Sequence, residues 1–525
     1  MADMITLGDL QVRCRFTVVT LQKCRIQAKY GEHTKVEIIC TVRGEETRTV
    51  FSDIKKDNLE IFCREDSGRE QVLFAGIIQS IELIEEGRYA ALQLKAISNT
   101  WKMDIKRKSR SFQNVALTYQ DIAREITKEY NADMRWNALD KSIQDPLIQY
   151  QETDYCFLKR ILSHLHGEIT SEDIGSSISF WAGMKKGTDR GKINLNEYVY
   201  STIWYAKDKW VDKPREMWQL GYLIEGRTLV NVGDLVQIGG RNYYVTEAET
   251  LFERNVLCCK YKVFPKKCFE TETILADNLR RIVITGKVLE TKQEYVKMHL
   301  DIDKKQLCSE AYDFPWKPFT GNLLYCMPEV GTRVALYFSE GDEKSAVAVM
   351  NVRENGEQCG ELTDYHNRYF TTKERKRMYL KPEEIGLLNM ANKNAEIALK
   401  DGSLLQVKTI HQLSVLAEGQ VELKGRNVTI TTPKEATLVR KDVLSPTVIN
   451  LCNAFDAIGK RGNFASTASV IEKQKRMLAS GVQCEKYSLQ GAVSMILSNI
   501  PAAEEGNTVA EAIAGSMPDI IFKSK

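Results

Sequence analysis

Apolar residues recur mostly with a period of two between Val18 and Ile97, and glycines punctuate the pattern. Residues 35–40, 72–78 and 89–96 show the pattern most clearly. Successive side chains of a β-strand point to opposite faces of the sheet, so strict alternation is typical of half-buried strands. Several such strands separated by turns predict a β-sandwich or β-barrel in the first hundred residues.

The apolar period changes after Thr118. Residues 118–121 read Thr-Tyr-Gln-Asp, a capping box, and apolar residues then recur at the spacing of one helix face. We expect a second helix after Thr153, with Gly167 as its stop. The two apolar faces are formed by Ile122, Ile126 and Tyr130, and by Phe157, Ile161, Leu162 and Leu165.

Alternation returns between Ile178 and Phe264, where Gly239-Gly240 predicts a hairpin turn. Residues 282–351 predict a compact barrel of about five strands, the size of an OB-fold. Within it, the stretch 325–351 carries a structural motif in which proline opens a strand, glycine permits the turn, and glycine-aspartate makes a hairpin. Its residues are Pro328, Val330, Gly331, Phe338, Gly341, Asp342 and Asn351.

Short alternating pieces separated by glycines follow between residues 385 and 432. Examples are 397–399, 405–407, 421–423 and 428–430. Such pieces cannot bury an apolar face alone, so they predict a stacked or multi-chain β-helix or β-prism. The segment after residue 466 is alanine-rich, with helical faces at Val470, Ile471 and Leu478 and a second capping box at 508–511.

Composition excludes several classes of function. The 525 residues carry a net charge of +3, whereas a dedicated nucleic-acid binder normally shows a strong basic excess. The 13 cysteines include no CxxC pair, which argues against a zinc site or a disulfide framework. We see neither a signal peptide nor an apolar run long enough to span a bilayer, so we expect assembly in the cytoplasm.

The order of these segments resembles the VgrG family, the spikes of type VI secretion and related contractile injection systems. The 325–351 motif resembles the OB-fold core of that family, and three further segments resemble its hub and phage late-control proteins: 98–122, 149–158 and 231–245. The resemblance spans residues 15–435, and the tail after Phe455 lies outside it.

The resemblance implies a non-enzymatic structural protein without cofactor or metal. It implies a homotrimeric hub and spike that caps a tail tube, organises baseplate proteins and pierces a target membrane. A small PAAR-type tip protein and effector cargo are implied partners, nucleic acid is not, and the particle would act at or through the cell envelope.

The expected fold class is mainly β with a small α/β insert. It comprises two hub β-barrels, an OB-fold barrel, an intertwined trimeric stem and a partly helical tail. The expected domains are residues 1–110 for the first hub barrel, 111–175 for the insert, 176–270 for the second hub barrel, 278–355 for the OB-fold, 356–450 for the stem and 451–525 for the tail.

Other functions fit the sequence less well than a structural hub and spike. His164 and His166 form a metal-like pair, but a helix points residues two apart in different directions. A muramidase domain does not fit between Asn351 and Ile385. An OB-fold nucleic-acid binder would use aromatics such as Trp316, Tyr325 and Tyr337. An effector or hydrolase activity would have to lie in the tail, which could equally be a docking element or a plain cap of the stem.

Overall fold

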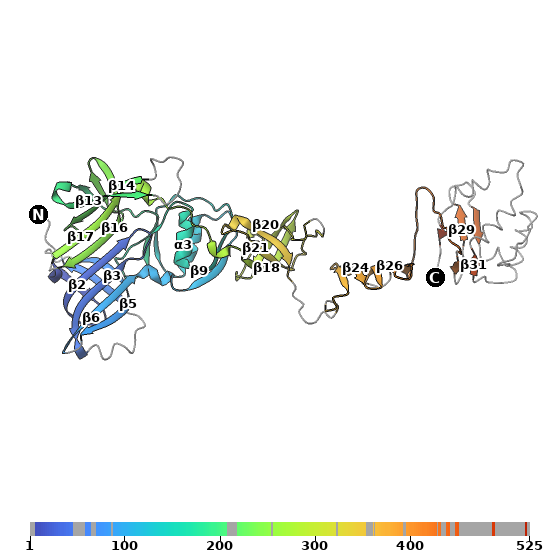
Figure 1. The fold of residues 1–525 in the computed structure, drawn as a ribbon, viewed down its shortest axis with the longest axis horizontal. Helices are drawn as coiled ribbons and strands as arrows, with labels where there is room; N and C mark the ends of the chain where they lie inside the picture. Colours follow the sequence, from blue (N-terminus) through green and yellow to red (C-terminus); the bar gives the residue numbers. More distant parts are fainter. Residues whose placement is uncertain are drawn as a thin grey trace, which may run out of the picture. The chain divides into compact units, whose positions relative to one another are not determined.

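The computed structural model shows two compact units, residues 1–354 and 355–525, and each is described by itself (Figure 1). The structure describes residues 6–45, 58–64, 70–85, 88–206, 218–253, 256–321, 324–352, 361, 363–391, 395–427, 429–431, 437–440, 447–450, 486–488 and 520–521.

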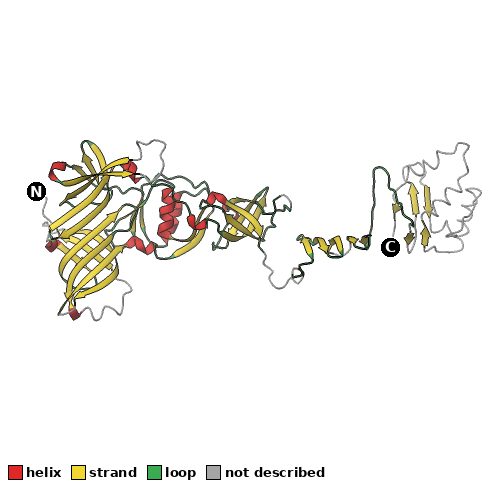
Figure 2. Ribbon diagram, viewed as in Figure 1, coloured by secondary structure: helices red, strands yellow, loops and turns green. Residues whose placement is uncertain are grey.

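A 12-stranded sheet dominates the first unit, and Figure 2 shows how strands outweigh helices there. Its main path runs β1-β4-β5-β6-β3-β2-β16-β17-β14-β13, with β15 and β12 attached beside β16. The first set of strands is β1 Leu10–Arg13, β2 Val18–Lys29, β3 Lys35–Arg43, β4 Asn58–Arg64, β5 Glu70–Glu85 and β6 Tyr89–Ser98. The second set is β12 Asp189–Lys192, β13 Val199–Ala206, β14 Trp218–Gly226, β15 Leu235–Ile238, β16 Arg241–Glu253 and β17 Val256–Phe264.

The two sets meet at a seam between β2 and β16. Six antiparallel residue pairs join these strands, from Glu247 opposite Lys29 to Phe252 opposite Cys24. Each set curls around its own apolar core, one centred on Ile38 and Leu92 and the other on Val236 and Val245. The two expected barrels are therefore continuous parts of one sheet.

The α/β insert holds the two α-helices of the described residues. α2 Tyr119–Lys128 begins at the expected capping box, since the Thr118 and Asp121 side chains satisfy each other's backbone N–H groups. α3 Asp154–Ser163 begins at Thr153, whose hydroxyl accepts from Cys156 N. The strands of the insert are β7 Arg107–Phe112, β8 Asp133–Trp136, β9 Leu147–Thr153, β10 Ile169–Ser171 and β11 Ser179–Ala182.

One strand falls on the other side of an expected boundary. β11 pairs with β8 and β10, so it adds to the sheet of the insert, whereas the sequence suggested that the second barrel begins at residue 176. Alternation alone could not separate them, because strands of both sheets have the same period.

The small barrel contains five strands in the order β20-β19-β18-β21-β22. A parallel bridge between Trp316 and Ala348 brings its two ends together. Inward side chains such as Leu336 and Phe338 are fully buried and form one core with Phe314. The strands are β18 Val283–Lys292, β19 Tyr295–Leu300, β20 Asp313–Pro315, β21 Arg333–Phe338 and β22 Ala346–Asn351.

The second unit begins with a five-stranded antiparallel meander, in which each strand pairs with the next in sequence. The expected pieces 397–399 and 405–407 lie in its strands, whereas residues 421–423 are extended and unpaired. The strands of this meander are β23 Arg368–Thr371, β24 Lys376–Lys381, β25 Glu384–Asn389, β26 Ala395–Lys400 and β27 Leu404–Thr409.

The rest of the second unit is described only in short pieces. β28 Thr429–Thr431 pairs with β31 Lys486–Ser488, and β29 Thr437–Arg440 pairs with β30 Thr447–Asn450 and β32 Ile520–Ile521. The expected helical faces at Val470, Ile471 and Leu478 and the box at 508–511 lie outside the described residues. The expected class, mainly β with a small α/β insert, is confirmed.

None of the helices in the described residues is long and apolar enough to cross a membrane.

Replacing Thr118 by alanine tests the insert. The substitution removes the cap of α2 and should cost roughly 1 kcal/mol of local stability. Native-state hydrogen exchange of the α2 amides measures this cost, and Thr153→Ala at α3 is a matched second cap. Unchanged protection of α2 would contradict the role of the capping box.

Candidate functional site

The motif residues of the 325–351 stretch lie around one end of β21. Gly331 has φ +92° and ends a turn in which Thr332 N donates to Glu329 O at 3.1 Å. Its own N–H donates to Val288 O at 2.8 Å, which ties the turn to β18. Only glycine, or less readily asparagine, suits this backbone conformation. The expected role of Gly331 therefore has a clear geometric basis.

The other motif residues are divided between the core and the surface. Phe338 is fully buried in the barrel core and Pro328 is buried, whereas Val330 and Asn351 are exposed. Pro328 does not open the strand as expected, because β21 begins five residues later at Arg333. The proline lies in the loop ahead of the turn, where its missing N–H costs nothing.

The Gly341-Asp342 pair opens a longer connection than a tight hairpin. Asp342 caps a short 3-10 helix, η8 Glu343–Ser345, by accepting from Lys344 N. Gly341 lies against Asp277, which leaves no space for a side chain, and its carbonyl accepts from Ala276 N at 2.7 Å. This connection places Glu343 against the insert, a consequence that the motif did not reveal.

Glu343 forms a buried ion pair with Arg160 of α3. The Arg160 side chain is 2% exposed and the Glu343 side chain is 4% exposed. Arg160 Nη1 lies 2.6 Å from Glu343 Oε1, while Nη2 donates to Ile148 O at 2.8 Å and lies 3.1 Å from Glu152 Oε2. The guanidinium thus joins the insert to the small barrel across 183 residues of sequence.

Electrostatics around Arg160 reflect burial of all three charges. Burial acts to lower the pKa of Arg160, but the carboxylates of Glu343 and Glu152 outweigh it, so the pKa of Arg160 is raised. Burial raises the pKa of Glu152, and Arg160 opposes this only in part. Two carboxylates share one guanidinium, so removal of Arg160 would leave both carboxylates without their cation, and removal of Glu343 would leave Arg160 Nη1 without its acceptor.

A second clamp joins the insert to the opposite part of the barrel. Asp303 accepts from Ser111 N at 2.6 Å and from Ser111 Oγ at 2.5 Å, and Gln113 Oε1 accepts from Tyr312 N at 3.2 Å. Ile148 of β9 adds an apolar contact, because it packs within the barrel core. We call these contacts, together with the Arg160 ion pair, the joint. It is a set of rigid attachments and holds no reactive group.

Asp154 anchors the start of α3 just behind the joint. Its buried carboxylate accepts from Lys108, Arg110 and Tyr130 at 2.6 Å each, and from Gln149 at 2.9 Å. Burial alone raises the pKa of Asp154, but the hydrogen bonds from Lys108 and Tyr130 outweigh it and hold the pKa below its usual value. Asp154 lies within residues 149–158, the segment that resembles the hub.

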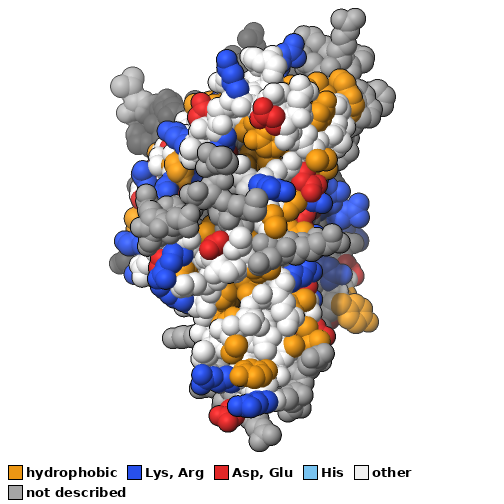
Figure 3. Space-filling model, turned by 90° about the vertical axis from the view of Figure 1, so that its left-hand side faces the viewer, with side chains coloured by type: hydrophobic (Ala, Val, Ile, Leu, Met, Phe, Trp, Pro, Cys, Tyr) orange, Lys and Arg blue, Asp and Glu red, His pale blue; other side chains and the backbone are white. Residues whose placement is uncertain are grey.

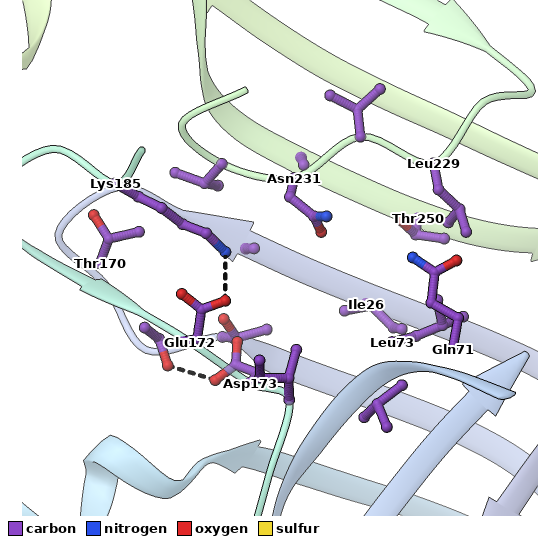
Figure 4. Close-up of a pocket in the computed structure, with 18 of the residues that line it drawn as sticks. Ile26, Gln71, Leu73, Thr170, Glu172, Asp173, Lys185, Leu229, Asn231 and Thr250 are labelled. Carbon is purple, nitrogen blue, oxygen red and sulfur yellow. Dashed lines mark hydrogen bonds and ion pairs between the residues drawn. The ribbon is translucent and has the colours of Figure 1, made fainter. Parts of the chain in front are cut away.

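A cavity of about 500 Å³ lies beside the seam (Figure 4). Ile26 and Thr250 form part of its floor, and its charged residues are already satisfied: Glu172 pairs with Lys185 at 3.1 Å, and Asp173 accepts from Ser171. Acid–base chemistry needs a group within reach of a substrate proton, and these carboxylates are committed to internal partners.

The histidine pair does not lie in a helix, as the sequence had suggested. α3 ends at Ser163, so His164 and His166 lie in the turn that follows and not in a helix. His164 Nδ1 lies 3.1 Å from Tyr119 Oη, and His166 Nδ1 lies 3.1 Å from Thr271 O. Within the described ranges, no cluster of three or more histidine, cysteine or acidic side chains is placed to hold a metal ion.

The aromatics considered for nucleic-acid stacking have other roles or separate positions. Trp316 is 5% exposed and donates its indole N–H to Cys326 O, and Tyr337 packs edge-on against Phe319. Tyr325 is exposed. Figure 3 shows lysine and arginine side chains spread over the hub end among hydrophobic ones, without one continuous basic strip on that face.

Sequence comparison identifies part of the chain. Residues 33–165 match the family described as phage tail baseplate hub (GPD). This segment is similar to a phage tail baseplate hub. None of the curated proteins compared matches the chain. The hub match covers β3 to α3, and it confirms the resemblance to VgrG-type hub and spike proteins.

Three solved structures are among those to which this chain is similar. An Escherichia coli protein, c3393, described as a type VI secretion component similar to T4 tail proteins gp27 and gp5, is 15% identical, with a TM-score of 0.48 over 65% of this chain and 100% of its own. The Francisella PdpA–VgrG complex, half-lidded, is 8% identical, with 0.49 over 78% and 89%. A 43 kDa tail protein of prophage MuSo2 from Shewanella oneidensis is 11% identical, with 0.40 over 50% and 99%.

The likeness to a phage tail baseplate hub is shown for residues 33–165. The sequence motifs predicted the hub but did not indicate Arg160, Glu343 or Asp303. One signal was available: an arginine on the helix face that also carries Phe157 and Ile161 must find a buried partner.

Replacing Gly331 by valine should destabilise the small barrel by about 1–3 kcal/mol, because a β-branched residue is strained at positive φ. Gly331→Asn is the matched control and should cost less. Hydrogen exchange of the β18 and β21 amides measures the difference. Equal protection in the two variants would contradict the assigned turn.

Replacing Glu343 by alanine should cost about 1–3 kcal/mol, because Nη1 of the buried Arg160 loses its hydrogen-bond acceptor while Glu152 still balances the charge. Lys344→Ala, at an exposed neighbour, should change stability by about 0–1 kcal/mol. Urea unfolding of both variants, followed by exchange of barrel amides, gives the comparison. Similar values for the two would show that the joint does not hold the barrel.

Proposed function

We propose that three copies of this chain assemble through the meander β23–β27 into the stem of a hub and spike. The observation that carries the proposal is the uncovered apolar face of that meander. On this proposal, residues 356–450 form the stem and residues 278–355 the barrel between hub and stem.

The strand register gathers the apolar side chains of the meander on one face. Two rows cross the strands, and their members face one another pair by pair in the ladder. One row is Phe370, Met378, Leu387, Ile397 and Val407, and the other is Leu380, Ile385, Leu399 and Leu405. All nine side chains are between 41% and 62% exposed.

The opposite face of the meander has a different character. It carries charged residues such as Lys381, Glu384 and Lys408, and its one large buried side chain is Tyr379. Tyr379 lies over Gly386 and donates its hydroxyl to Glu396 at 2.8 Å. The meander thus has one charged face with a packed tyrosine and one exposed apolar face. Soluble proteins rarely leave a continuous apolar face of this kind uncovered.

A second and a third copy of the same sheet are the natural cover. Three identical sheets placed around an axis turn their apolar faces inward and form a closed prism. The extended residues 410–427 support this, since Leu413, Val415 and Leu423 are 49–60% exposed and find no partner strand among the described residues. Interlocked chains would supply both the missing strands and the missing core.

On this proposal each chain transmits force along its length. The hub caps a tail tube and contacts baseplate proteins, the joint transmits force to the barrel, and the stem passes it to a tip that meets the target membrane. A tip protein of the PAAR kind and effector cargo would attach beyond the stem. The chain acts mechanically, so no catalytic residue is required.

Light scattering tests the proposal directly. The full chain of 59.8 kDa should have the mass of three copies. Leu387→Asp together with Ile397→Asp should lower that mass, because carboxylates would be buried without partners. Lys400→Ser with Lys408→Ser changes the other face and should keep the trimer. A stable monomer of the unaltered chain would overturn the proposal.

A further inference from the structure

The cavity beside the seam exists because two apolar cores share one sheet. Ile26 and Ala28 of β2 lie opposite Thr250 and Ala248 of β16, and all four residues line the cavity. Ile26 belongs to one core and Ala248 to the other, so the cores diverge at this point. The small side chains of Ala28 and Ala248 leave the space between them unfilled. Its volume of about 500 Å³ lies within the range of small-ligand pockets.

Three parts of the first unit form the walls of the cavity. One wall is the loop 229–232 of the second strand set, another is the segment 170–174 of the insert, and the third is the beginning of β5. Glu172 holds the insert wall in place, because it accepts from Trp181 Nε1 at 2.5 Å and pairs with Lys185 at 3.1 Å. The cavity is therefore preformed, which lowers the cost of binding a ligand.

An edge of β5, and not one of its faces, borders the cavity. Residues 70–73 all line it, although successive side chains of a strand point to opposite faces. β4 pairs with β5 along one edge as far as Glu70. On the other edge, β6 pairs with β5 only from Gly76 onward, where Ser98 ends β6. Within the described ranges, residues 70–74 therefore have no partner strand on the side of β6.

This free edge has the properties needed for strand addition. An unpaired strand edge presents N–H and C=O groups with which an extended peptide can pair. Proteins usually cover such an edge, whereas here the loop 229–232 and the insert leave a cavity beside it. In strand addition the main-chain hydrogen bonds provide affinity, and pockets for alternate side chains provide specificity.

Three polar side chains of the cavity have no hydrogen-bond partner in the part of the chain that the structure describes. Thr170 is the clearest, because the residue is only 3% exposed and its hydroxyl is unpaired. Buried polar groups are nearly always hydrogen-bonded. Figure 4 shows the other two, the amides of Asn231 and Gln71, directed from facing walls into the cavity. Each amide can donate and accept, as pairing with a peptide group requires.

Asp173 favours a basic side chain in the ligand. One of its oxygens accepts from Ser171 Oγ, and among the described residues it forms no ion pair with lysine or arginine. Burial raises the pKa of the Asp173 carboxyl, and hydrogen bonds and nearby charge offset this only in part. The other acidic residues of the cavity, Glu172 and Glu70, already have basic partners. A cation that enters the cavity would therefore pair with Asp173.

We propose that the cavity binds an extended peptide segment of a partner protein. The peptide adds as a strand to the free edge of β5 at residues 70–74, and it places a lysine or arginine beside Asp173. An apolar side chain of the peptide fills the space next to Ala28 and Ala248. The site uses no residue of the meander, so the inference goes beyond the proposed trimer and does not depend on it.

Peptide capture by the full chain tests the site. The probe is a pool of pentapeptides with lysine at the centre and valine, leucine or threonine elsewhere, and a second pool has glutamine at the centre. Equilibrium dialysis read by mass spectrometry should show lysine peptides enriched about tenfold over their glutamine counterparts, because a charge-assisted hydrogen bond is gained. Asp173→Asn should remove this difference. Glu82→Gln, at an exposed carboxylate near the other end of β5, is the matched control and should keep it.

Hydrogen exchange of the unaltered chain locates the bound peptide without relying on a variant. The most enriched peptide should slow exchange in residues 70–74 and leave the amides of β17 unchanged, because only the free edge gains partners. The inference is overturned by an absence of enrichment, by a lysine preference that survives Asp173→Asn, or by unchanged exchange at residues 70–74. None of these outcomes alters the mass of the assembly, so the proposed function is tested separately.

Discussion

The ion pair between Arg160 and Glu343 is the interaction on which the first unit depends. It is buried on both sides, and it links a helix of the insert to the connection between the last two barrel strands. A buried ion pair is weak evidence for stability by itself, because desolvation offsets the attraction. Its geometric consequence is stronger: the charges are satisfied in only one relative position of insert and barrel. A part that must pass on force without bending benefits from such a constraint.

The seam between β2 and β16 provides the second constraint. It makes the two strand sets continuous, so the hub behaves as one curved sheet instead of two tethered barrels. The Arg25–Glu249 ion pair crosses it, and Gln27 donates to the same carboxylate. The insert contacts the small barrel through Arg160, which pairs with Glu343, and through Ser111, which donates to Asp303. Each attachment uses backbone-tied or buried polar groups, which hold position better than exposed pairs.

Local sequence chemistry predicted local structure well. Thr118 with Asp121 marked the start of α2, and Gly239-Gly240 forms the hairpin between β15 and β16, with both residues at positive φ. Gly331 marked a turn for the same reason, because it too has a positive φ. These features depend on neighbours within a few residues, so the sequence contains their whole cause. The mainly β class and the barrel at residues 282–351 followed from alternation.

Contacts between residues far apart in the chain could not be predicted from the sequence. Arg160 and Glu343 are far apart in the chain, and neither stands in a motif that requires the other. β11 was assigned to the wrong sheet because alternation does not say which neighbour a strand pairs with. Residues 421–423 alternate as a strand does yet belong to no strand among the described residues, and the proposed trimer would supply their ladder partners from other chains.

The exposed apolar face of the meander makes folding of the proposed stem depend on the concentration of the chain. If three sheets complete one core, stem folding and subunit association are a single event, and the concentration of trimer rises with the third power of the concentration of free chain. A dilute chain would keep a finished hub and an unfinished stem, whereas a crowded site of synthesis would drive completion. Once closed, the prism could separate only by exposing all three apolar faces together. Assembly would then depend on the concentration of free chain, whereas the persistence of the completed trimer would not.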